Sequence, residues 1–127
     1  MKIRHLLMGA VLAGFLSLAP SAHAQGHSVT LGFTKSVDDT GVTGSGYTAW
    51  RANGTCPASV TDTTGFTALN STLFTGTSYV DSAVTGGSTY CYMVTFTLSG
   101  NSSVPSNTAQ TVVPVAPPTN VHIPNQQ

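Results

Sequence analysis

The sequence predicts an all-β fold in which antiparallel strands form a sandwich or a barrel. Several short segments alternate apolar and polar residues with the period of a half-buried strand, and clusters of Gly, Asn, Asp, Ser and Pro separate them. No segment after residue 24 has a helical period or a run of strong helix formers. We therefore expect one antiparallel β domain.

Residues 1–24 are predicted to be a secretory signal peptide that is removed before Gln25. A basic start is followed by an apolar stretch and a small-residue cleavage site. These parts are Lys2 and Arg4, residues 6–18, and Ala22-His23-Ala24. A membrane anchor would need about 20 apolar residues, and Pro20 ends this run earlier. We expect a secreted protein, periplasmic or extracellular, with no membrane attachment after cleavage.

The rest of the 127 residues suits one domain at residues 25–114, with a flexible or strand-like tail at residues 115–127. Charged side chains make up only 6% of the sequence, and the domain's two cations, Lys35 and Arg51, are outnumbered by four aspartates. Nucleic-acid binding needs a basic surface, so we expect no nucleic-acid partner.

The first strand is predicted at residues 28–34. Val29, Leu31 and Phe33 alternate with polar or small residues, so these three side chains are expected in the core. Residues 38–41, Asp-Asp-Thr-Gly, have the composition of a loop.

A second strand is predicted at residues 47–51. Its alternation places Tyr47 and Ala49 on one face, with Tyr47 in the core, and Trp50 on the other face. The turn-forming pair Asn53-Gly54 ends it.

The polar stretch at residues 55–65 has no strand period and is predicted to be a long loop. Short edge strands are expected at residues 66–69 and 77–80. Asp81 is placed to cap the turn that leads toward Val84.

The central strand of the sheet is predicted at residues 90–96, after a turn at residues 86–89. Large apolar side chains occupy one face, as a strand with one face in a core requires. This core face carries Tyr90, Tyr92, Val94 and Phe96, and the other face carries Cys91, Met93 and Thr95. A loop at residues 99–103 and a last strand at residues 108–113 are expected to follow.

Four of these stretches resemble, in order and spacing, strands B, C, F and G of a fibronectin type III module, the immunoglobulin-like β-sandwich common in exported bacterial proteins. They are Ser28-Val29-Thr30-Leu31-x-Phe33-Thr34, Gly46-Tyr47-x-Ala49-x-Arg51, Gly87-x-Thr89-Tyr90-x-Tyr92-x-Val94 and Gly100-Asn101-x-Ser103-x-Pro105-Ser106. The resemblance implies that Tyr90 is the tyrosine-corner residue, whose hydroxyl ties the preceding connection to the backbone. Phe33 stands where the family usually has a core Trp.

The resemblance also implies a missing strand A, because only residues 25–27 precede the strand B motif in the expected mature chain. Residues 116–123 are similar to the strand A opening of a following module. Two interpretations of this segment stay open. It is a disordered remnant of a longer tandem array, or it completes the sandwich of a neighbouring copy.

Cys56 and Cys91 are most simply a disulfide that ties the long loop to the outer face of the central strand. A reactive or metal-binding pair is the alternative. Zinc would need two further ligands, and the expected mature chain offers only His27 and His122, one at each end. We expect no metal site and no cofactor.

Catalysis is not expected. A nucleophilic hydroxyl needs a base held within hydrogen-bond reach, and neither histidine lies in a predicted strand. Glycoside hydrolysis needs two carboxylates across a cleft, whereas the aspartates are better explained as loop and turn residues.

Trp50 and Met93 form a candidate binding surface. Strand parity puts Trp50 on the outer face of the sheet, with Cys91 and Met93 on a neighbouring strand. An exposed Trp stacks on sugar rings or anchors protein partners. The alternative is that Trp50 merely covers the disulfide.

Three functions follow from these observations. The first is a noncatalytic exported module that binds or spaces, with an unidentified extracellular protein or carbohydrate as partner. The alternative is a self-associating structural subunit that assembles by head-to-tail strand donation. The third, a small secreted hydrolase, would require a cleft with a positioned base.

Overall fold

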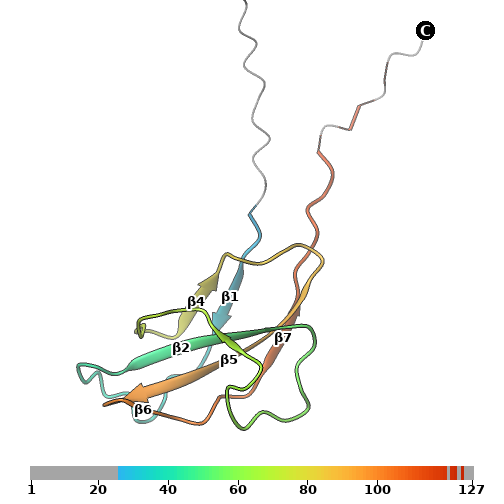
Figure 1. Ribbon diagram of the computed structural model, residues 1–127. Coiled ribbons are helices and arrows are strands. Elements are labelled where there is room, and N and C mark those ends of the chain that lie inside the picture. Colours follow the sequence, from blue (N-terminus) through green and yellow to red (C-terminus); the bar gives the residue numbers. More distant parts are fainter. Residues whose placement is uncertain (1–25, 120, 123, 125–127) are drawn as a thin grey trace, which may run out of the picture.

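The computed structural model describes residues 26–119, 121, 122 and 124. Within them the chain forms strands and no helix, so the all-β prediction is confirmed (Figure 1). The strands are β1 (Val29–Gly32), β2 (Gly46–Asn53), β3 (Thr67–Ala68), β4 (Ser78–Asp81), β5 (Thr89–Leu98), β6 (Asn101–Ser102) and β7 (Ala109–Val112). The predicted signal peptide lies outside the described residues. In the described part of the chain, no helix has the length and apolar character needed to cross a membrane.

The strands form two antiparallel sheets. β1 pairs with β4, and β3, β2, β5 and β6 follow one another in a larger sheet in which β7 also pairs with β5. β5 is the central strand, because β2 pairs along one edge while β6 and β7 share the other. The predicted loop at residues 99–103 is instead a tight hairpin, since Ser99 and Gly100 adopt positive φ angles and bring β6 back onto β5.

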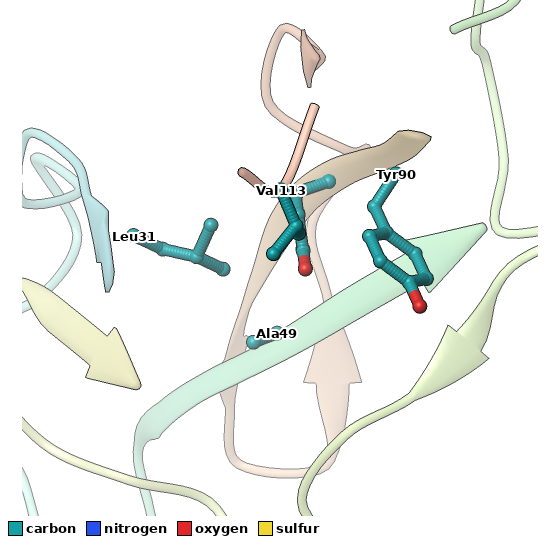
Figure 2. Packing of buried hydrophobic residues seen from close by; sticks show 5 residues of the cluster. Leu31, Ala49, Tyr90 and Val113 are labelled. Atoms are coloured by element: carbon teal, nitrogen blue, oxygen red, sulfur yellow. The ribbon is translucent and has the colours of Figure 1, made fainter. Parts of the chain in front are cut away.

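The two sheets share a hydrophobic core, as in a β-sandwich. Buried side chains from both sheets meet there (Figure 2). They are Leu31 of β1, Ala49 of β2, Tyr90 and Tyr92 of β5, and Val113 after β7. Of the other predicted core residues, Val29 and Phe33 are only half-buried. Val29 lies in β1 and Phe33 directly follows it, and β1 has one edge without a partner strand among the described residues.

A second cluster, rich in aromatic rings, lies at the other end of the larger sheet. Tyr47, Val94 and Phe96 are buried there, and Phe33 and Phe74 pack against them. The ring centroid of Tyr47 lies 4.8 Å from that of Phe33 and 5.1 Å from that of Phe96. These contacts extend the core to the end of β5.

The predicted outer face of β5 is covered, and this overturns part of the candidate binding surface. Met93 is only 2% exposed, and Cys91 and Thr95 on the same face are also buried. Trp50 lies opposite Met93 in the β2–β5 register, and its indole N–H donates to Thr95 Oγ1 at 3.0 Å. The half-buried indole therefore lies along this face and hides it. Met93 is a packing residue, and the prediction that it contributes to a binding surface is wrong.

Candidate functional site

The predicted disulfide is present between Cys56 and Cys91. Cys56 follows β2, and its backbone N–H also donates to Gln110 Oε1 of β7 at 2.9 Å. Cys91 and Gln110 are partners in the β5–β7 register. The start of the long loop is thus attached to both β5 and β7, and the bridge fits an oxidising compartment.

Tyr90 makes the backbone contact that the resemblance implied for it. The N–H of Thr85, in the connection between β4 and β5, donates to the Tyr90 hydroxyl at 3.1 Å. This hydrogen bond lowers the pKa of the Tyr90 hydroxyl, because it favours the phenolate. The guanidinium of Arg51 lies 5.0 Å from the centre of the Tyr90 ring. The ring therefore also makes a cation–π contact.

Asp81, Arg51 and Tyr92 form a charged network between the two sheets. Asp81 Oδ2 accepts from Arg51 Nη1 at 2.8 Å and from the Tyr92 hydroxyl at 3.0 Å. Its other oxygen accepts from the Ala83 N–H at 3.0 Å, which is the predicted turn contact. Asp81 is only 4% exposed, so its charge is compensated by these donors rather than by water.

Sequence reasoning missed this network, although a signal for it was present. Arg51 has the same strand parity as Tyr47 and Ala49, which places its side chain on the core face of β2. A buried Arg requires a buried acceptor. Four aspartates were available, and only the packing of β4 against β2 identifies Asp81 as the partner.

Burial, together with the hydrogen bond to Asp81, raises the pKa of Tyr92. Burial disfavours the phenolate, and the hydrogen bond to the Asp81 carboxylate adds to the effect. A tyrosine in the unfolded chain loses its proton near pH 10, whereas Tyr92 in the folded chain keeps it to higher pH. The Tyr92 contribution to stability is therefore complete below about pH 10 and is lost as the pH rises further.

We expect Tyr92→Phe to weaken the alkaline loss of stability. The free energy of unfolding should fall less steeply above pH 10 than in the parent chain, by up to about 1.4 kcal/mol per pH unit. Tyr90→Phe is the matched control, because the lowered pKa of Tyr90 makes its contribution to stability rise with pH only below about pH 10. Its removal should abolish that rise and leave the slope above pH 10 unchanged. Urea titrations between pH 8 and pH 11 measure both slopes. Equal slopes for the parent and the Tyr92 variant would contradict the assignment.

A groove of about 640 Å³ lies between β1 and residues 103–111. The Phe33 N–H donates to Thr77 O on the β4 side. Backbone groups of successive strand residues point to opposite edges, so those of Thr30 and Gly32 point to the other edge of β1. No strand pairs with that edge among the residues described. The groove therefore contains an open strand edge.

The described side chains that line the groove are uncharged. Its floor comes from the inner face of β5, including Tyr92, Val94 and Phe96. Its walls come from β1, from residues 103–107 and from β7. None of the described lining residues is Asp, Glu, Lys, Arg or His. An uncharged polypeptide could be buried here without the cost of desolvating a charge.

No group of three His, Cys, Asp or Glu side chains gathers within the described part of the chain in a way that could hold a metal ion. The most buried aspartate, Asp81, is engaged by Arg51 and Tyr92 and does not line the groove. The open edge of β1 and the groove beside it are therefore the candidate site. No protein-family model matches the chain, and no curated protein matches its sequence.

Proposed function

We propose that the chain is a noncatalytic, exported module of the fibronectin type III kind that binds an extended polypeptide segment along the open edge of β1. The observation that carries this function is the groove of about 640 Å³ beside the outward-facing backbone groups of Thr30 and Gly32. An added strand would hydrogen-bond to those groups and cover the apolar floor.

The fibronectin type III assignment is supported by the tyrosine corner. In immunoglobulin-like sandwiches a Tyr near the start of strand F bonds to the backbone a few residues upstream. Tyr90, the second residue of β5, accepts from the Thr85 N–H. The pairing of β1 with β4 and of β2 with β5 and β7 agrees with sheets B–E and C–F–G of that fold.

A polypeptide ligand is favoured over a carbohydrate. The indole N–H of Trp50 already donates to Thr95, and its ring lies against β5, so it offers less stacking surface than an exposed Trp. The groove instead presents a row of backbone donors and acceptors, which are complementary to another extended backbone. Export is supported by the disulfide and by the signal-like residues 1–24.

The test is to select binders from a display library of random ten-residue peptides on the immobilised chain that begins at Gln25. Selected peptides should alternate apolar and polar residues. Thr30→Pro removes a backbone N–H from the groove edge and should weaken their binding about tenfold, the equivalent of one hydrogen bond. Binding is measured by fluorescence anisotropy.

Val80→Pro is the matched control. Val80 lies opposite Thr30 in the β1–β4 register, and its N–H points to the far edge of β4. Both variants replace a β-branched residue on a free edge of the same small sheet, so they perturb the fold alike. Selected peptides that bind equally well to the two variants would show that the open edge of β1 is not the binding site.

A further inference from the structure

We infer that the segment taken up by the groove is residues 115–124 of a second copy of this chain. This inference rests on the proposed function, since it names the partner of the same groove.

The tail leaves at the pole where β1 begins. A Cβ placed on Gly86 would lie 2.8 Å from the His27 ring, just before β1, and 3.1 Å from the carbonyl oxygen of Pro114, just after β7. Figure 1 shows the chain entering β1 and the segment after β7 leaving at this same end, with residues 115–119 directed away from both sheets. Val115 is 71% exposed and Val121 is 87% exposed, so these apolar side chains do not cover their own domain.

This exit point makes the domain's own groove hard to fill. A strand that runs antiparallel to β1 must enter from the opposite pole, and residues 29–34 span about 17 Å. Extended chain from Val113 to Pro117 covers at most about 14 Å, and it would also have to turn back. The same exit direction suits a second copy placed end to end with the first. The tail would reach that copy at the end opposite to the start of its β1, which is where an antiparallel strand has to enter.

The composition of the tail matches the groove. Thr119, Val121 and Ile123 alternate with Asn120 and His122, the pattern of a strand with one face on a core. Pro117 and Pro118 precede this segment, and proline is accepted at the start of a strand. Residues 115–127 contain no Asp, Glu, Lys or Arg. An uncharged segment would thus enter an uncharged groove.

The contact joins two different surfaces, a tail on one copy and a groove on the next. Such head-to-tail contacts do not close as a two-fold dimer, and they generate rings or open filaments. The weight-average mass of the chain that begins at Gln25 should therefore rise with concentration beyond that of a dimer.

The test changes the tail, which donates the strand, separately from the groove, which receives it. Val121→Asp puts a charge on the inserted face of the tail, and Thr30→Pro blocks the groove edge; each variant alone should remain monomeric in sedimentation velocity. An equimolar mixture should form a 1:1 dimer and stop there. The intact tail of the Thr30 variant binds the intact groove of the Val121 variant, and the dimer is left with a damaged tail and a blocked groove. Val42→Asp, in the loop before β2, and Val80→Pro are the matched controls and should assemble like the parent chain.

A mixture that stays monomeric, or single variants that assemble like the parent, would overturn the inference. Val121 is exposed in the tail, so its variant tests the role of the tail even where Thr30→Pro fails to fold. A parent chain that is monomeric at all concentrations but still binds library peptides, with sensitivity to Thr30→Pro, would overturn self-association and leave the proposed function standing. A chain that binds neither would overturn both.

Discussion

Replacing Arg51 with alanine is expected to destabilise the domain by about 3 to 5 kcal/mol, because it leaves the charge of Asp81 buried without its cation. Asp81 is 4% exposed, and Arg51 also donates to the carbonyl of Ala83 at 2.8 Å, so the substitution removes one donor from each of two acceptors. Denaturant titration of both chains measures the change in the free energy of unfolding. The slope of that free energy against denaturant concentration should be the same for the two chains.

The ion pair of Lys35 with Asp39 provides the control, because its cation is exposed and Asp39 keeps the Tyr47 hydroxyl as a donor when Lys35 is removed. Its atoms are 3.7 Å apart and the Lys35 side chain is 54% exposed, so Lys35→Ala should cost at most about 1 kcal/mol. Asp81→Ala combined with Arg51→Ala should cost less than the sum of the single changes, since neither charge is then left alone. Equal losses in the free energy of unfolding for Arg51→Ala and Lys35→Ala would mean that the buried network does not stabilise the fold.

Removing the disulfide by replacing Cys56 and Cys91 together with alanine should cost about 4 kcal/mol on the chain-entropy model. The bridge joins residues 35 positions apart and restricts the unfolded chain across β3, β4 and the long loop. Alanine is the suitable replacement because Cys91 is fully buried, where serine would bury a hydroxyl.

Chemical reduction of the parent chain is the independent control. The reduced parent and the double alanine variant should unfold at nearly the same urea concentration, well below that of the oxidised parent. A double variant as stable as the oxidised parent would show that the bridge does not limit the unfolded chain.

Much of the fold could be predicted from local pattern. Alternation of side chains identified β1, β2 and β5, and the abundance of apolar residues on β5 identified it as the central strand. The pairing of Cys56 with Cys91 also followed from residues, because only two cysteines were available in a chain that was predicted to be exported. The hydrogen bond of Tyr90 was expected from the resemblance to fibronectin type III modules, and its geometry agrees.

The sequence by itself determined which residues share a strand face, because the period of two is a property of the extended backbone. Only the tertiary structure decided what covers each face. Met93 has the parity of an outer residue, yet the indole of Trp50 lies across it. Arg51 has the parity of a core residue, and only the packing of β4 brings Asp81 to it. The groove beside β1 likewise depends on which strand edges find partners, and such long-range contacts leave no periodic signal in the chain.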